Sequence, residues 1–298
     1  MLEKNKISNG SVNWLLFFNI ILYVVITEVV IFVNSYFTFE QPDTYTTRIV
    51  VQLFAILIPV IIFTKSRNIN VKSFFRINYI SLKNVVLLVG LGFCSQFIGL
   101  LFKLFVRLIF NVFKIPYAVN TYNISLPETG FQTLLAVTAL MILPVLAEEL
   151  LFRGLVLRSY EKWGTRSAIV ISALLFSLLH LDISGLPATL FMGFLLSYVV
   201  IKTDSLIAGL ILHFVNNSVA FLLAMFPVGK IALMVLFIIA LIVFLPLLLS
   251  FYKNNIKSKS IPQKRSIASE ITRTVFTLPI LLSIIAFIIV QLYVFNIF

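Results

Sequence analysis

The chain alternates between long apolar runs and short polar stretches. Because an α-helix rises about 1.5 Å per residue, roughly 20 apolar residues cross the ~30 Å of hydrocarbon in a bilayer. The runs are continuous and do not alternate with a period of two, which argues against membrane β-strands. We therefore predict an all-α, polytopic transmembrane helical bundle of eight to nine spans, because several runs are short or interrupted. The nine runs cover approximately residues 13–34, 47–64, 84–102, 131–157, 165–181, 186–202, 205–226, 230–252 and 274–296.

The overall composition supports this interpretation. Of the 298 residues, 60% are hydrophobic and 11% are charged, and the mean hydropathy is +1.08. A soluble domain of this size does not need so much apolar surface. We therefore interpret residues 1–298 as a single multi-pass domain of the cell membrane, with the lipid bilayer as its surroundings. The single cysteine, Cys94, excludes an intrachain disulfide and a cysteine-based metal site.

The positions of the charges predict the orientation in the membrane. The net charge of +12 does not indicate a nucleic-acid partner, because the basic residues lie in loops that alternate along the chain. Loops rich in Lys and Arg face the cytoplasm, whereas the other loops hold Glu40, Asp43, Glu128 and Asp182 with few cations. We expect a cytoplasmic N-terminus and, with nine spans, a C-terminus outside. The predicted cytoplasmic cations are Lys4, Lys6, Lys65, Arg67, Lys72, Arg76, Lys83, Arg158, Lys162, Arg166, Lys202, Lys253, Lys257, Lys259, Lys264, Arg265 and Arg273.

Two segments have the pattern of helices that lie along a membrane surface. Lys103, Arg107, Asn111 and Lys114 recur at helical spacing among apolar residues, which favours an interfacial helix on the outer side. We expect residues 73–83 to form a similar helix on the cytoplasmic side.

The run at 131–157 carries charges that an ordinary membrane helix avoids. It contains Glu148, Glu149 and Arg153, and each charge at the centre of a membrane helix costs about 2.5–3.5 kcal/mol on insertion scales. The spacing of four residues favours a Glu149–Arg153 ion pair. Glu148 points about 100° away from Glu149 and so faces another partner. Pro144, one turn earlier, frees a backbone carbonyl and favours a kink. A packing role alone would explain the ion pair, but not the second carboxylate.

The only two histidines of the chain lie in later apolar runs. Phe176 and His180 share one helix face, as do His213 and Asn217. From the helical rise, these residues and Glu148 lie roughly 12–20 Å from the cytoplasmic ends of their helices. We therefore predict a polar cavity near the middle of the membrane, formed by side chains of three helices.

This set of residues fits hydrolysis by an activated water. A carboxylate near a histidine can take a proton from water and deliver it to a leaving amine. A second histidine with an asparagine offers two donors to the oxyanion of a tetrahedral intermediate. No serine or cysteine lies convincingly beside a base, which argues against a covalent nucleophile. The zinc signature His-Glu-x-x-His is absent. Two histidines and two glutamates remain an alternative zinc site, which Arg153 would disfavour electrostatically; we predict no metal and no cofactor.

Three motifs of the chain resemble those of a known family. Glu148-Glu149-x-x-x-Arg153, Phe176-x-x-x-His180 and His213-x-x-x-Asn217 are similar, in order and spacing, to the motifs of the CAAX-protease and bacteriocin-processing (CPBP, or ABI) intramembrane endopeptidases. The resemblance covers about residues 131–226, which would form the catalytic core helices.

The resemblance implies specific roles for these residues. It implies that Glu148 is the general base on water and His180 its partner. It also implies that Glu149 and Arg153 are a structural pair, and that His213 and Asn217 stabilise the oxyanion. Eukaryotic relatives cut after prenylated cysteines, but the Ile-, Asn- and Lys-rich composition suggests an AT-rich bacterium. The substrate is therefore expected to be a peptide or a membrane protein.

Two other functions compete with the endopeptidase. A non-catalytic membrane scaffold or bacteriocin-immunity protein would use the polar cluster to bind a peptide or a membrane partner. A proton-coupled transporter would use the intramembrane Glu and His groups, although the chain has no internal repeat. The sequence does not specify the substrate, the cleavage site or the oligomeric state.

Overall fold

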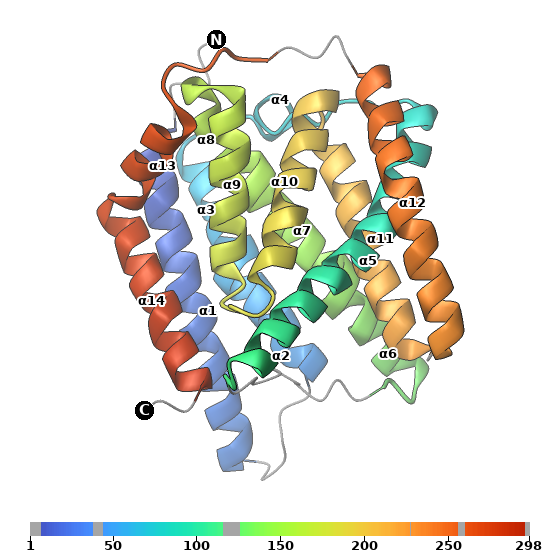
Figure 1. The fold of residues 1–298 in the computed structure, drawn as a ribbon. Helices are drawn as coiled ribbons and strands as arrows, with labels where there is room; N and C mark the ends of the chain where they lie inside the picture. The colour runs from blue at the N-terminus through green and yellow to red at the C-terminus, as the bar shows by residue number, and fades with distance from the viewer. Residues whose placement is uncertain (1–6, 38–43, 116–125, 227, 256–259, 296–298) are drawn as a thin grey trace.

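The computed structural model describes residues 7–37, 44–115, 126–226, 228–255 and 260–295, and within them it contains helices and no β-strand. The prediction of an all-α helical bundle is confirmed, and Figure 1 shows the long helices packed side by side. The α-helices are α1 (Asn9–Phe37), α2 (Thr44–Val51), α3 (Ile58–Ser66), α4 (Val71–Phe74), α5 (Leu82–Val112), α6 (Gly130–Val137), α7 (Leu143–Glu149), α8 (Leu157–Tyr160), α9 (Thr165–Leu179), α10 (Leu186–Thr203), α11 (Leu206–Met225), α12 (Lys230–Asn254), α13 (Ile267–Val275) and α14 (Leu278–Val294).

Several of these helices join into longer continuous ones. A π-helical segment, Gln52–Leu57, connects α2 with α3, and two more, Thr138–Ile142 and Leu150–Val156, connect α6 with α7 and α7 with α8. A short 3₁₀ turn, Glu161–Trp163, ends this last helix. At its other end, the Thr129 hydroxyl accepts a hydrogen bond from the Gln132 main chain, and the Gln132 side chain accepts one from the main chain of Thr129. This capping box fixes where the helix begins.

Among the described residues, seven helical segments are long and apolar enough to cross a membrane, and the α13–α14 pair, bent by 77°, counts as an eighth. The chain is therefore a multi-pass membrane protein. Each of the nine predicted runs corresponds to a helix or a joined set of helices. However, α9 has 15 residues and rises only about 22 Å, which is too short to span ~30 Å of hydrocarbon.

The short helix α9 forms a hairpin with α10, and its turn lies inside the bundle. Figure 1 shows this turn well above the lower ends of α1, α12 and α14. Beneath it passes the second half of α5, where Phe102 packs against Phe191 of α10 with 5.7 Å between ring centroids. Asp182, which we expected in an outer loop, belongs to this internal turn.

The structure corrects both predicted interfacial helices. Residues 103–112 continue α5 without a break, because no Gly or Pro interrupts the helix there. With 31 residues, α5 is about 46 Å long, and a helix longer than the bilayer core is accommodated by tilting; Figure 1 shows it running obliquely. On the other side, residues 73–83 are not one helix, since α4 ends at Phe74 and α5 begins at Leu82.

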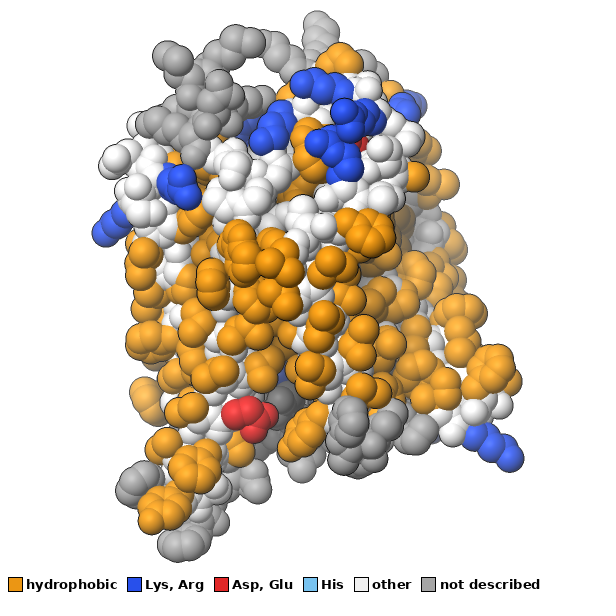
Figure 2. Space-filling view, turned by 90° about the vertical axis from the view of Figure 1, so that its left-hand side faces the viewer, with side chains coloured by type: hydrophobic (Ala, Val, Ile, Leu, Met, Phe, Trp, Pro, Cys, Tyr) orange, Lys and Arg blue, Asp and Glu red, His pale blue; other side chains and the backbone are white. Residues whose placement is uncertain are grey.

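Basic side chains gather at one end of the molecule. On the face drawn in Figure 2, most of the visible Lys and Arg side chains lie at the upper end, above a broad band of hydrophobic side chains. Glu161 binds Arg76 at 2.5 Å and Arg158 at 2.8 Å there, and Arg76 also binds Asp204 at 2.8 Å. These ion pairs join the segment after α4 to the ends of α8 and α10. The predicted charges Lys4, Lys6, Glu40, Asp43, Lys257 and Lys259 lie outside the described residues.

Candidate active site

The acidic stretch lies where one long helix changes its winding twice. α7 carries Glu148 and Glu149 between the two π-helical segments, a rare geometry that occurs mostly at functional sites. Pro144 near the start of α7 has no N–H group and cannot bond to the carbonyl of Leu140 four residues earlier. The Asn217 side-chain amide of α11 donates to that carbonyl at 3.1 Å. Pro144 therefore frees a carbonyl, as the sequence predicted, and α11 uses it.

Glu149 and Arg153 form the ion pair that their spacing predicts. The guanidinium NH1 lies 2.9 Å from Glu149 Oε1, and both side chains are fully buried. A second guanidinium nitrogen donates to the carbonyl of Gly193 in α10 at 3.2 Å, and the group lies 4.5 Å from the centre of the Phe176 ring. Because the ionised Arg153 reaches α9 and α10 as well as its own helix, this pair holds three helices together.

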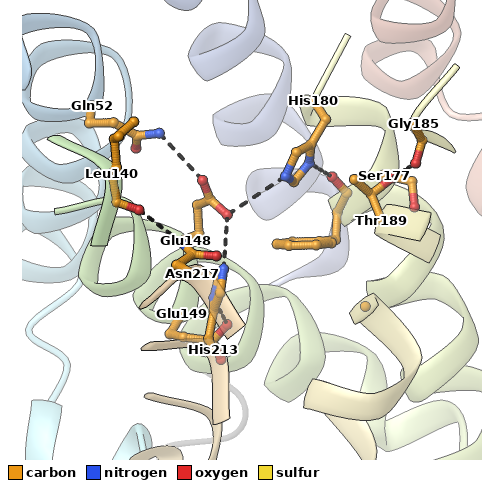
Figure 3. A network of polar contacts seen from close by, with 12 residues as sticks. Gln52, Leu140, Glu148, Glu149, Ser177, His180, Gly185, Thr189, His213 and Asn217 are labelled. Atoms are coloured by element: carbon orange, nitrogen blue, oxygen red, sulfur yellow. Dashed lines mark hydrogen bonds and ion pairs between the residues drawn. The ribbon is translucent and has the colours of Figure 1, made fainter. Parts of the chain in front are cut away.

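Glu148 faces both histidines. Its Oε2 lies 3.9 Å from Nε2 of His180 and 4.0 Å from Nε2 of His213, as the dashed lines in Figure 3 show. Its other oxygen, Oε1, accepts a hydrogen bond of 3.3 Å from the Gln52 side chain. Glu148 and His213 are buried, whereas the His180 side chain is 30% exposed. Side chains of α7, α9 and α11 therefore meet at one point, as the matching depths of the residues predicted.

The partners of each ring fix which nitrogen points at Glu148. Nδ1 of His180 lies 2.8 Å from the carbonyl oxygen of Phe176, and a carbonyl can only accept a hydrogen bond. Nδ1 of His213 lies 3.0 Å from Glu149 Oε1, a carboxylate oxygen that is already paired with Arg153. Each Nδ1 is therefore the donor, and in the neutral rings each Nε2 carries the lone pair that faces Glu148.

Asn217 bonds to the main chain of the long helix that carries Glu148. Sequence reasoning paired Asn217 with His213 as oxyanion donors, but the Asn217 amide is directed at Leu140. It also lines a pocket of about 220 Å³, together with Leu140, Tyr45 of α2 and Phe221 of α11. This pocket extends from Asn217 toward the lower end of the bundle in Figure 1, where α6 begins. Its lining is mostly apolar and does not include Glu148, His180 or His213.

Metal ligation is not evident in the geometry. Among the described residues, no group of three or more His, Cys, Asp or Glu side chains is arranged to hold a metal ion. Glu149, one of the four ligands considered from the sequence, is engaged by Arg153 and His213.

Sequence reasoning missed Gln52. This residue lies in the π-helical segment between α2 and α3 and is the hydrogen-bond donor to Glu148. Like Glu148, a glutamine inside an apolar run is a polar residue that needs a hydrogen-bond partner, although it carries no charge. Arg48 lies at helical spacing in the same run, four residues earlier, but nothing in that run indicates Glu148, so only the folded structure connects Gln52 to the site.

A comparison with protein-family models places this geometry in context. Residues 130–219 match the model described as type II CAAX prenyl endopeptidase Rce1-like. This segment is similar to the CAAX-protease family. It contains all seven residues named in the three motifs, and it runs from the start of α6 into α11. The resemblance inferred from the motifs is therefore confirmed, and the CAAX-protease match points to a membrane protease of this type. No curated protein and no solved structure matches the chain.

Proposed function

We propose that this protein is an intramembrane endopeptidase that hydrolyses a peptide or membrane-protein substrate with a water activated by Glu148. The observation that carries the proposal is the convergence of two imidazole Nε2 atoms on Glu148 Oε2, at 3.9 and 4.0 Å. The CAAX-protease match over residues 130–219 gives independent support.

The spacing suits a shared water molecule. Separations near 4 Å are too long for direct hydrogen bonds, but one water oxygen about 2.8 Å from each of two acceptors bridges such a gap. Glu148 Oε2 and His180 Nε2 are both acceptors, and a water has two O–H groups to donate. A water held between them would therefore be oriented and polarised by both groups.

The reaction then follows from proton bookkeeping. Glu148 takes one proton of the water while the water oxygen bonds to the scissile carbonyl carbon, and a tetrahedral oxyanion forms. The C–N bond breaks as this proton is delivered to the leaving nitrogen, which yields a carboxylic acid and an amine. His213 becomes a donor to the oxyanion only when its Nε2 is protonated, because Nδ1 already faces Glu149. The two carboxylates have different roles: Gln52 holds Glu148 for proton transfer, and Arg153 neutralises Glu149.

The test compares the membrane and secreted peptidomes of cells that carry the wild type, Glu148→Ala, His180→Ala and Glu28→Gln. Glu28 is the matched control, because it is also a glutamate of an apolar helix but is exposed on α1. We expect certain peptide termini to appear only in cells that carry the wild type or Glu28→Gln. The amount of these peptides should fall by about 10²–10⁴-fold in the two site variants. Peptidomes that do not change in Glu148→Ala cells would refute the proposal and favour the scaffold or immunity function.

A chelator arm separates this mechanism from zinc hydrolysis. Membranes that carry the wild type are treated with 1,10-phenanthroline and mixed with the peptide identified above. We expect unchanged cleavage, because the proton transfers assigned here need only Glu148 and His180. Loss of cleavage that added Zn²⁺ restores would assign the reaction to a bound metal instead.

A further inference from the structure

The turn that follows His180 contains backbone groups that a membrane interior does not tolerate alone. α9 ends at Leu179 and α10 begins at Leu186, and the turn between them lies inside the bundle. Non-helical backbone at membrane depth persists only where protein or a polar cavity satisfies its N–H and C=O groups. Leu181 is in the left-handed region, with φ of 49°, which is uncommon for a residue with a branched side chain.

A glutamine from a distant helix satisfies two of these groups. The Gln291 side chain of α14 donates to the carbonyl of Leu181 at 2.7 Å and accepts from the N–H of Ile183 at 3.0 Å. The rest of the turn is stabilised locally, for example by the Asp182 carboxylate, which accepts from the main chain and the hydroxyl of Ser184. Gln291 therefore provides long-range hydrogen bonds between this turn and the C-terminal part of the chain.

Gln291 is itself an unusual residue in its helix. It is 7% exposed. The other polar residues of α14 are Tyr293 and Ser283, and the Ser283 hydroxyl donates to the carbonyl of Pro279 within the same helix. A buried amide in an apolar helix is stabilised when both its oxygen and its nitrogen are hydrogen-bonded. Both are bonded here, and both bonds go to main-chain atoms within three residues of His180.

From this geometry we infer that Gln291 is a positioning residue: through the α9–α10 turn it holds the His180 ring in place against Glu148. The His180 side chain is 30% exposed, more than those of Glu148 and His213, and its Nδ1 bond to Phe176 and its contact with the Phe176 ring fix it locally. A displacement of about 1 Å of a reacting group costs on the order of 10²-fold in rate. α14 lies outside the matched segment 130–219. The C-terminal helix would therefore contribute a contact that positions His180 and that the matched segment does not contain.

The catalytic part of this inference rests on the proposed function, but the positioning part has its own readout. The chain has only two histidines, so full-length protein labelled with ¹⁵N-histidine in lipid nanodiscs gives two pairs of ring signals, one Nδ1 and one Nε2 signal per ring, which a His180→Ala variant assigns. In the wild type we expect a single tautomer for His180, with the proton on Nδ1. In Gln291→Leu we expect the His180 signals to broaden or to show the second tautomer, while the His213 signals stay unchanged and report an intact fold. Ser283→Ala, a buried polar position of the same helix, is expected to leave both rings unchanged.

Processing is measured in the same variants by the peptidome comparison. We expect Gln291→Leu to lower product formation by about 10-fold or more, and Ser283→Ala to leave it at the wild-type level. The inference is wrong if His180 keeps its wild-type signals in Gln291→Leu. It is also wrong if Gln291→Leu processes as well as the wild type while Glu148→Ala abolishes processing. If Glu148→Ala itself leaves processing intact, the proposed function fails, and the ¹⁵N signals alone decide whether Gln291 holds His180.

Discussion

Within the site, every ionisable side chain except Glu148 has a close partner that determines its role. Arg153 neutralises Glu149, Glu149 orients His213 through Nδ1, and the Phe176 carbonyl orients His180 in the same way. Glu148 has no such cation: its closest basic groups are the two Nε2 atoms near 4 Å. Two adjacent carboxylates thus have different surroundings, and the one without a strong partner is the one available for proton transfer.

The contrast between the two glutamates predicts opposite effects on stability. Replacing Arg153 by Met leaves the Glu149 carboxylate buried without its cation, and breaking a buried pair costs about 3–5 kcal/mol. Glu148→Gln removes a charge that has no direct ion pair, so its free energy of unfolding is expected to stay within about 1 kcal/mol of the wild type. Unfolding from mixed micelles, followed by circular dichroism, measures both. Equal losses in the two variants would contradict the division of roles.

Sequence reasoning identified the residues of the site but not all of their contacts. The Glu149–Arg153 pair follows from helical spacing, and the approach of Glu148 to the histidines follows from their equal depth. The directions of the rings do not follow, because they depend on acceptors in other helices and on the main chain. For the same reason the hydrogen bond from Asn217 to the Leu140 carbonyl was not predicted, and Gln52 was not identified at all.

The helices around the site approach one another at glycines. An ideal Cβ on Gly193 of α10 would lie 2.8 Å from the Cα of Ala173 in α9, so these two helices pack backbone to backbone. On α11, an added Cβ on Gly209 would meet Glu149 Oε2 and would lie 2.9 Å from Val200. Small residues at membrane helix contacts allow such packing, and here they place the carboxylate of α7 directly against α11.

Gly209→Ala should therefore disturb the site more than an ordinary helix substitution does. Overpacking of a filled contact costs about 1–3 kcal/mol, and the displaced Glu149 also orients His213, so we expect lower stability together with reduced processing. Gly99→Ala in α5 is the matched control, because its Cβ would meet only Ala188 at an ordinary 3.8 Å. Unfolding measurements and product yield are compared for the two variants; the prediction is wrong if Gly99→Ala has the larger effect.

Helix boundaries were less predictable than the helices themselves. The apolar runs locate each helix because burial in lipid requires them, but length and polarity alone do not show whether a helix spans. The run at 165–181 forms the short α9 of an internal hairpin, and the cationic residues after 102 continue α5. Both differences depend on tertiary contacts: α5 supports the hairpin through Phe102 and Phe191, and Gln291 binds the turn.

At the scale of the whole molecule, the two ends of the bundle differ in charge and in access. α3 ends, α8 ends and α13 begins at the basic end, whereas the pocket beside Asn217 extends toward the opposite end, where α6 begins. α1 starts and α14 finishes at opposite ends of the bundle. This arrangement does not depend on how the α9–α10 hairpin is counted, because α9 begins and α10 ends at the basic end. Without the hairpin seven crossings remain among the described residues, with α13–α14 counted as one.

The orientation in the membrane can be tested with single cysteines. In a Cys94→Ala background, we expect Lys72→Cys and Arg265→Cys to resist a membrane-impermeant maleimide in intact cells and to react after permeabilisation, because basic segments remain in the cytoplasm. Lys114→Cys, at the other end of α5, should react in intact cells. The reverse labelling pattern would contradict the predicted cytoplasmic N-terminus. In the predicted orientation, the pocket lined by Asn217 lies toward the outer face, so the labelling result also decides on which side of the membrane this pocket lies.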